Sequence, residues 1–295
     1  MARSRIIGLG LAAALAAMAC SARAQEEDLA ALIKRAQTLT DRGDCLEAGR
    51  LWSRIVRLDP KDKVSWNQRG YCRTLSGRGE DALDDYDEAL RLDPGYGLAF
   101  ANRGYTYLQL RRLDRAVADF SAALAIDPAY LNARLGRAMA FSRAGEHDKA
   151  LADYRQAAEA APGNPRVYLN RGVVYERLNQ RDKALDDYSK AIELNPRYEE
   201  AYMARGSIFD DLERFEEALA DYKRAFEINP RNSRAEVAIA TLPVKAAAAG
   251  KPIPGSGMGS VKPPSSLPTM PPLPWDRPKS PPPGSGAGHT TGGQF

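Results

Sequence analysis

Residues 165–198 read PRVYLNRGVVYERLNQRDKALDDYSKAIELNPRY, and this 34-residue unit decides the fold because its landmarks occur six times in register. Prolines recur every 34 residues, at Pro60, Pro94, Pro128, Pro162, Pro196 and Pro230. Alanines keep the same interval, at Ala48, Ala82, Ala116, Ala150, Ala184 and Ala218. An aromatic residue follows each alanine by four positions, at Trp52, Tyr86, Phe120, Tyr154, Tyr188 and Tyr222. Such a period indicates a stack of small units that bury their apolar faces against one another.

Each unit predicts two antiparallel helices joined by a tight turn. A small residue precedes each alanine by twelve positions, at Ala36, Gly70, Gly104, Ala138, Gly172 and Gly206. Small side chains at these two positions let the helices cross closely, and the aromatic residue fills the layer between pairs. The proline ends the second helix, because it cannot continue the hydrogen-bond ladder. Gly43, Gly77 and Gly145 suit the left-handed cap that ends a first helix.

This pattern resembles the tetratricopeptide repeat and covers residues 29–232 without insertion. The resemblance implies an all-α, right-handed α-solenoid of six helix-turn-helix repeats. Their expected bounds are 29–62, 63–96, 97–130, 131–164, 165–198 and 199–232. Residues 233–242 (SRAEVAIATL) predict a capping helix over the last repeat, with an unstructured exit as the alternative.

The two ends of the chain differ from the repeats. Residues 1–24 are typical of a signal peptide, with a charged start, a 14-residue uncharged run and a cleavage pattern that ends at Ala24. This predicts a periplasmic or secreted protein. One alternative is a membrane anchor that is retained. The other is a lipoprotein, in which lipid attached to Cys20 would be the contact with the membrane. Residues 243–295 hold 13 prolines and 9 glycines and predict a disordered tail, either a spacer or a polyproline-type docking segment.

Charge and motifs exclude several classes of function. Residues 25–242 carry 34 basic and 37 acidic residues, so the repeats offer no general basic field for nucleic acid. His147 and His289 lack partners at metal-ligand spacing, and no phosphate loop or nucleophile elbow is present. We therefore expect no catalytic residues, no metal and no cofactor.

Two further columns are charged at positions where the resemblance implies an apolar contact. Every repeat has arginine just before its small residue, at Arg35, Arg69, Arg103, Arg137, Arg171 and Arg205. Sixteen positions later five repeats have aspartate, at Asp85, Asp119, Asp153, Asp187 and Asp221. Pairing within each repeat uses every aspartate and leaves only Arg35 over, so it is favoured over pairing between repeats. We expect this arginine–aspartate ladder to fix helix register, with a ligand-binding arginine row as the alternative.

Two cysteines remain after cleavage at Ala24. Cys45 opens the second helix of repeat one, and Cys72 lies late in the first helix of repeat two. Because these helices are consecutive and antiparallel, both residues lie at the same end of the pair. This predicts a disulfide in an oxidising compartment, against two free buried thiols.

The resemblance also implies a binding groove, because first helices of this family line a concave face that holds partner peptides. The candidate groove residues are Asn67, Tyr71, Asn102, Tyr105, Leu135, Met139, Leu169, Asn170 and Val173. The family's clamp for a terminal carboxylate is absent, since its columns read Ile33, Gln37, Gln68, Leu98 and Asn102. An apolar groove with amides suits an extended peptide or a helix; the alternative is that these residues only pack against one another.

The sequence thus predicts a protein-interaction scaffold of the cell envelope whose partner is an unidentified protein or peptide. Two other functions stay open: a self-assembling structural module, and an accessory subunit of an envelope enzyme.

Overall fold

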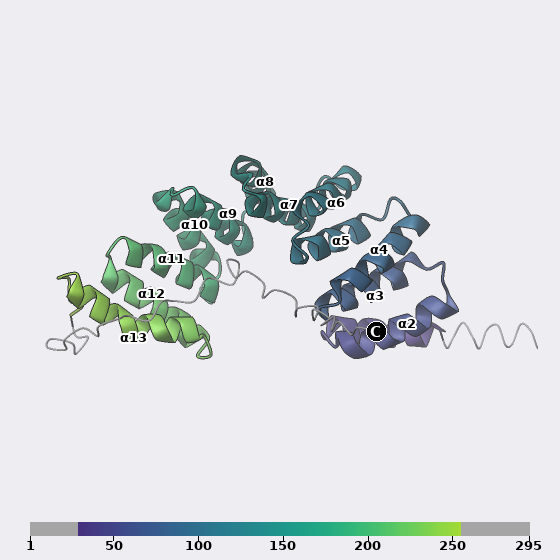
Figure 1. The fold of residues 1–295 in the computed structure, drawn as a ribbon, viewed down its shortest axis with the longest axis horizontal. Helices are drawn as coiled ribbons and strands as arrows, with labels where there is room; N and C mark the ends of the chain where they lie inside the picture. Colours follow the sequence, from purple (N-terminus) through teal and green to yellow (C-terminus); the bar gives the residue numbers. More distant parts are fainter. Residues whose placement is uncertain (1–28, 255–295) are drawn as a thin grey trace, which may run out of the picture. The chain divides into compact units, whose positions relative to one another are not determined.

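The structure is a computed structural model that describes residues 29–254 (Figure 1). The predicted signal peptide at 1–24, and the part of the predicted tail from 255 to 295, lie outside the described residues. Residues 29–254 fold entirely into helices and connecting turns, so the all-α prediction is confirmed. The chain divides into two compact units, one ending at Pro196 and one beginning at Arg197, and each is described by itself.

In the first unit a helix over residues 29–41 is followed by nine more helices in chain order (Figure 1). They are α2 (Cys45–Leu58), α3 (Lys63–Leu75), α4 (Gly79–Leu92), α5 (Gly97–Gln109), α6 (Leu113–Ile126), α7 (Leu131–Ala144), α8 (His147–Ala160), α9 (Pro165–Arg177) and α10 (Arg181–Leu194). From α2 to α10, each helix packs on the next one along the chain. The first helices of successive repeats also contact one another, since α3 touches α5, α5 touches α7 and α7 touches α9. The first helices of this unit therefore share one face.

The second unit holds α11 (Glu199–Asp211), α12 (Phe215–Ile228) and α13 (Ser233–Ala248). Here α11 packs on α12, and α12 packs on α13. No helix within residues 29–254 is long and apolar enough to cross a membrane.

Helix ends follow the signals in the sequence. The side chain of Asp62 caps α3 by accepting from the amides of Val64 and Ser65, at 3.0 and 3.1 Å. Asn164 caps α9 in the same way, with Pro165 in its first turn. These caps satisfy amide groups that the first turn of a helix leaves unpaired.

Position 15 of the repeat adopts a left-handed backbone whether or not it holds glycine. Gly43, Gly77 and Gly145 have φ of 83°, 77° and 82°, as their position predicts. The remaining three repeats hold Arg111, Asn179 and Glu213, with φ of 59°, 56° and 55°. The geometry of the turn therefore overrides the residue preference.

Close approach explains the glycines of the first helices. A Cβ atom placed on Gly172 would lie 2.6 Å from Cε1 of Tyr188, a ring that is fully buried. A Cβ on Gly136 would lie 2.4 Å from the ring of Phe120. The aromatic rings thus occupy the space that a larger side chain would need.

The end of the predicted capping helix at residue 242 is wrong, because α13 continues to Ala248 with Pro243 inside it. Leu242 and Ala246 are one turn apart on the face that is buried against α12. After the helix, Ile253 also packs into this core, and Lys251 forms an ion pair of 2.6 Å with Glu213. The apolar residues buried by this extension offset the hydrogen bond that proline removes.

Candidate functional site

The arginine–aspartate ladder is confirmed as a set of pairs within repeats. In all five pairs the arginine Nη2 donates to Oδ1 of the aspartate sixteen residues later, at 2.5 to 2.8 Å. The aspartate side chains are between 1 and 8% exposed, and the arginine side chains between 13 and 24%. The unmatched Arg35 is exposed and pairs instead with Glu47 of α2, at 2.9 Å. The packing role is thereby favoured over a solvent-facing row of arginines.

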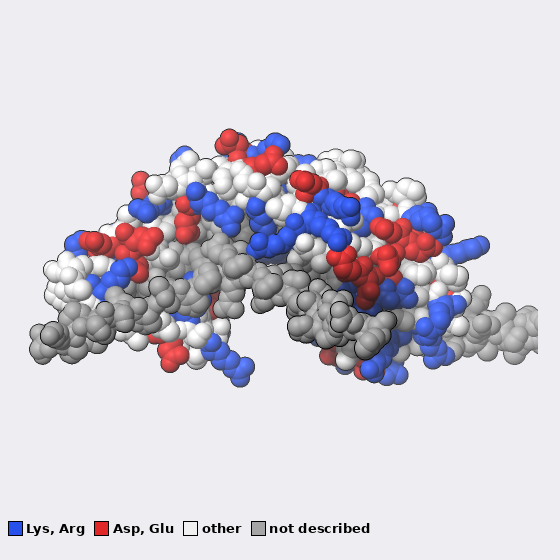
Figure 2. Space-filling model, in the orientation of Figure 1, with Lys and Arg blue, Asp and Glu red and all other residues white. Residues whose placement is uncertain are grey.

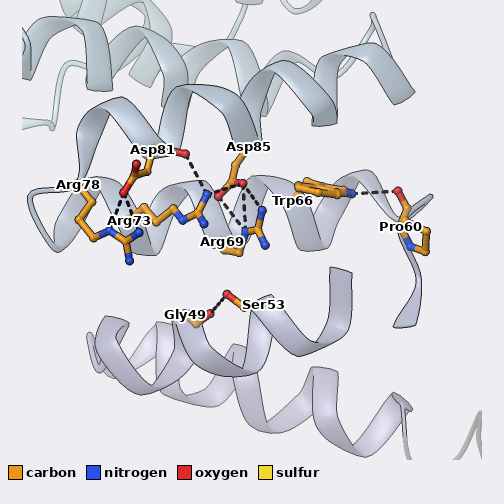
Figure 3. A network of polar contacts seen from close by, with 9 residues as sticks. All are labelled: Gly49, Ser53, Pro60, Trp66, Arg69, Arg73, Arg78, Asp81 and Asp85. Atoms are coloured by element: carbon orange, nitrogen blue, oxygen red, sulfur yellow. Dashed lines mark hydrogen bonds and ion pairs between the residues drawn. The ribbon is translucent and has the colours of Figure 1, made fainter. Parts of the chain in front are cut away.

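Figure 3 shows the first of these pairs, where α3 meets α4. Arg69 donates from Nε and Nη2 to the carboxylate of Asp85, and Arg73 adds an ion pair of 2.7 Å to the same oxygen. The ring of Trp66 lies 4.6 Å from the guanidinium carbon of Arg69. Burial raises the pKa of Asp85 above its ordinary value, and the two arginines oppose that rise.

Aromatic residues three positions before the ladder arginines cover the guanidinium groups. Phe100 stacks on Arg103 at 5.5 Å, and Tyr168 stacks on Arg171 at 5.5 Å. Sequence reasoning missed this column, although its spacing of three residues on a helix places both side chains on one face. Trp66 and Tyr202 occupy the same position before Arg69 and Arg205, whereas Arg137 has Arg134 there, so the cation–π attraction applies to four of the five pairs.

The ladder also joins neighbouring repeats. Nη1 of Arg103 contacts Asp87 of the preceding second helix, α4, and Nη1 of Arg137 contacts Ser121 of α6 at 3.3 Å. The guanidinium groups of Arg103 and Arg137 therefore each contact an aspartate within their own repeat and also a polar side chain of the preceding repeat. This supports the predicted role in fixing register.

A strip of half-buried side chains runs along the first helices of the first unit. Position 9 of successive repeats contributes Tyr71, Tyr105, Met139 and Val173, which lie on α3, α5, α7 and α9. We call these four residues the groove strip. Asn102 and Asn170, at position 6, are also half-buried. These six predicted residues keep part of their surface available to a partner.

Tyr105 is the best-defined member of the groove strip. Its ring packs edge-on against Phe120 with centroids 4.9 Å apart, and its hydroxyl donates to the Asn132 carbonyl at 2.7 Å. Burial raises the pKa of Tyr105, while the charge of Arg166 opposes that rise. The side chain is thus held in place and presents a rigid aromatic edge.

Three predicted groove residues are not available to a partner. Leu135 and Leu169 are 1% and 6% exposed and belong to the core, and Asn67 is 1% exposed. The physical reason is the contact between successive first helices, which closes over position 5 and leaves position 9 at the surface. Asn67 instead accepts a hydrogen bond of 3.0 Å from Nδ2 of Asn102.

The two cysteines lie together at the start of the first unit. Cys45 and Cys72 share a buried cluster with Trp52 and Ile55, and both are free thiols in this structure. The predicted disulfide is therefore not formed here, although the predicted proximity is. Burial is the main cause that raises the pKa of the Cys72 thiol from 9.0 to about 12, and the Cys45 thiol adds to the rise. The Thr40 hydroxyl, 3.7 Å from the Cys72 sulfur, partly opposes it.

Sequence reasoning also missed three arginines next to the groove strip, Arg111, Arg143 and Arg177, which we call the basic row. Arg143 and Arg177 occupy position 13 at the ends of α7 and α9, and Arg111 follows the end of α5. Their 34-residue spacing at position 13 was visible in the sequence, but only two repeats carry it. The described residues contain no group of three or more His, Cys, Asp or Glu side chains placed to hold a metal ion.

The comparisons with known proteins agree with this architecture. Family models described as tetratricopeptide repeat match residues 33–97, 101–165, 165–198 and 199–232. No curated protein sequence matches the chain.

Three solved structures show the same fold. A tetratricopeptide repeat protein from Parabacteroides merdae is 23% identical, with a TM-score of 0.61 over 72% of this chain and 84% of that one. A thermophilic repeat protein from Thermus thermophilus is 26% identical, with a TM-score of 0.53 over 61% and 98%. The anaphase-promoting complex assembly Cut9-Hcn1 is 16% identical, with a TM-score of 0.64 over 72% of this chain. The present chain spans only 42% of the length of the chain it matches in that assembly.

Repeats of this family generally mediate protein–protein interaction, and the fold is typically a non-catalytic scaffold. With four matched segments that cover most of residues 33–232, and with the paired helices described above, the chain belongs to the tetratricopeptide repeat family.

Proposed function

We propose that this protein is an interaction scaffold of the cell envelope that holds an extended peptide or a helix of a partner protein along the groove strip. The envelope location is supported by residues 1–24, whose charged start, apolar run and small-residue cleavage pattern are typical of an exported protein.

The observation that carries the proposal is the contrast between positions 5 and 9 of the first helices. Position 5 is closed by packing, as Leu135 and Leu169 show, whereas the apolar and aromatic side chains of the groove strip stay half-exposed. A row of such side chains on one shared face, repeated at a fixed spacing, suits an elongated partner better than a small molecule. The amides of Asn102 and Asn170 add donors and acceptors for a peptide backbone.

The test begins with the partner. Crosslinking in the native envelope followed by mass spectrometry identifies what the protein touches, and calorimetry then gives the affinity of the purified pair. Replacing Tyr105 and Met139 together by alanine is expected to weaken binding by about 2 kcal/mol or more, since buried aromatic anchors carry much of the binding energy. The control is Leu46→Ala on α2, where the side chain is 72% exposed and lies outside the groove strip. Equal affinity of the double variant and the wild type, with the helical spectrum intact, refutes the groove.

A second candidate function is self-association, and one observation in the second unit favours it. An apolar cavity of about 440 Å³ lies between α12 and α13, lined by Lys223, Phe226, Glu227, Glu236, Ile239 and Ala240. Exposed apolar surface of this kind at the side of a helix pair suits a further helix. Light scattering over a wide concentration range decides between the two: a constant monomer mass rules out self-association.

A further inference from the structure

Position 28 of the repeat, late in the second helix, packs against aromatic residues that follow it in the chain. In repeat two this position holds Leu90, which is 8% exposed. Leu90 shares a cluster with Tyr96, six residues further on, and Phe100, ten residues further on. In repeat three the position holds Leu124, and Tyr130, again six residues further on, packs against the same cluster. Rings supplied by the following residues therefore close this layer.

The last repeat lacks these rings. Its position-28 residue is Phe226 on α12, and the same offsets lead to Asn232 and to Glu236 in the first turn of α13. Phe226 and Ile239 pack on the core of the second unit but remain half-exposed. The apolar cavity of about 440 Å³ between α12 and α13 is lined by both of them, and it falls within the roughly 300–1,000 Å³ that ligand pockets usually have. The missing rings thus leave room for a large aromatic side chain.

Charged side chains form the rim of this cavity. Lys223 and Glu227 lie on α12, and Glu236 lies on α13. Glu227 forms an ion pair of 2.9 Å with Arg224. Lys223 and Glu236 form no ion pair with any other residue in the described range 29–254, although their charges are opposite. An occupant that suits this rim therefore carries both an acid and bases next to its apolar part.

The chain beyond α13 contains a segment with this pattern. Residues 271–279 read PPLPWDRPK, so Trp275 is followed by one acid, Asp276, and by two bases, Arg277 and Lys279. One acid and two bases complement the one base and two acids of the rim. The prolines of the segment restrict its backbone, so less conformational entropy is lost when it docks.

Other parts of the chain do not offer this combination. Trp275 and Phe295 are the only aromatic residues after Phe226, and residues 290–294 before Phe295 carry no charged side chain. Figure 2 shows acidic and basic side chains interspersed over the described part of the face that it draws, so no broad field of one sign attracts an occupant there. The local pattern of charge around the cavity therefore selects the occupant.

The described chain ends close to the cavity. Ile253 is 8% exposed and packs with Ala246 of α13 in the core of the second unit. Ala246 and Ile239 are seven residues apart on this helix, which corresponds to about 10 Å. The 21 residues between Ile253 and Trp275 reach on the order of 25 Å as a flexible chain, and further where proline extends them. A segment tethered in this way meets the cavity at an effective concentration on the order of millimolar, which favours it over a second copy.

We propose that residues 271–279 dock on the second unit of their own chain, with the indole of Trp275 in the cavity between α12 and α13. The two bases that follow Trp275 then meet the acids of the rim, and Asp276 meets Lys223. This inference goes beyond the proposed function and does not depend on the groove strip. Because the same cavity favours self-association, the docked segment would compete with a second copy.

The experiment follows Trp275 in the full mature chain labelled with 5-fluorotryptophan. The protein holds three tryptophans, so fluorine NMR gives three resonances, and Trp275→Phe assigns one of them by its loss. A synthetic peptide of residues 255–295 supplies the position of the undocked resonance. We expect the Trp275 resonance of the protein to differ from that position and to be shielded from a soluble paramagnetic compound.

Ala240→Glu tests the cavity, because Ala240 is exposed and lines it. The new carboxylate takes the space of the indole, so the docking equilibrium should fall by about tenfold or more and the resonance should move to the position of the free peptide. The control is Ala247→Glu, the same change at an exposed position of α13 that does not line the cavity. That variant should keep the wild-type resonance, and circular dichroism shows that both variants fold.

Glu236→Arg tests the rim. Reversal of this charge places it next to the bases of the segment and should weaken docking by about threefold. Adding Arg277→Glu to the same protein reverses the pair and should restore the wild-type resonance. The control is Glu216→Arg, which removes an acid from the first turn of α12 as Glu236→Arg does from the first turn of α13. A control that undocks the segment equally would show that the rim charge has no specific role, which overturns the inference.

The remaining outcomes decide where the segment lies. A wild-type resonance at the position of the free peptide overturns the inference, and so does an Ala240→Glu spectrum identical to that of the wild type. A resonance that moves toward the free position on dilution, while light scattering shows dimers dissociating, assigns the cavity to the segment of a second copy and overturns docking within the chain. A constant position at monomer mass supports it. None of these results bears on the groove strip, which is tested by Tyr105→Ala with Met139→Ala.

Discussion

Arg137 and Asp153 meet through two parallel hydrogen bonds of 2.8 Å each, from Nε to Oδ2 and from Nη2 to Oδ1. This fork contact recurs in five repeats, and its hydrogen bonds raise the pKa of Arg137 against the effect of burial. Both side chains are largely hidden from water, so each depends on the other.

Asp153→Ala is expected to lower the free energy of unfolding by roughly 1–3 kcal/mol, because it leaves the Arg137 guanidinium partly buried without its carboxylate. Urea denaturation followed by circular dichroism measures the change. The control is Glu159→Ala, an exposed carboxylate on the same helix, α8. If both variants unfold at the wild-type urea concentration, the pair contributes nothing to stability.

Gly172→Ala tests the close approach of helix and ring. Alanine gains about 1 kcal/mol of helix propensity over glycine, which favours the variant. The new Cβ would lie 2.6 Å from a ring that is closed in on all sides, and such overpacking costs about 1–3 kcal/mol. We therefore expect a net loss of thermal stability.

Gly163→Ala is the matched control for that variant. A Cβ at Gly163 meets no atom within 4 Å, and the residue has no left-handed φ. Its melting temperature should stay at or slightly above the wild-type value. A Gly172→Ala protein that melts as high as the Gly163→Ala protein would show that the ring yields at no cost.

The Cys72 thiol predicts a loss of stability at alkaline pH in the reduced protein. Its pKa is raised from 9.0 to about 12 on folding, so the folded state holds the proton more firmly than the unfolded state does. The stabilisation is complete below pH 9 and is lost as pH rises from 9 toward 12. The stability advantage of the reduced wild type over Cys72→Ala should shrink across this window.

The same comparison without reductant tests the predicted disulfide. A bridge between Cys45 and Cys72 would leave no thiol proton on Cys72 to lose, so the additional loss of stability at alkaline pH would vanish. Thiol quantification in the unfolded, unreduced mature protein gives an independent answer, since two reactive thiols per chain exclude the bridge.

Ile253→Ala tests the packing that follows α13. Ile253 is 8% exposed and shares a core with Leu242 and Ala246, so the variant should lose about 2 kcal/mol of stability. Leu75→Ala, at a site that is 52% exposed, is the neutral comparison. Unchanged stability of the Ile253 variant would show that the chain after Ala248 does not contribute to the core.

The sequence by itself determined the helix pairs, their register and the partners within the ladder. A period of 34 residues places proline, alanine and the aromatic residue where helices end and cross, and these are local and nearest-neighbour effects. The count of arginines and aspartates was enough to choose pairing within repeats, because pairing between repeats leaves Asp221 without an arginine.

Only the tertiary structure decided which of these side chains stay accessible. Positions 5 and 9 lie on the same face of a first helix, and the angle at which the next first helix packs buries Leu135 while it leaves Met139 half-exposed. The basic row arises in the same way, since Arg111 and Arg143 belong to neighbouring repeats. Packing against α12 likewise carries α13 through Pro243. Exposure depends on the packing angle between neighbours, and a repeat period does not encode that angle.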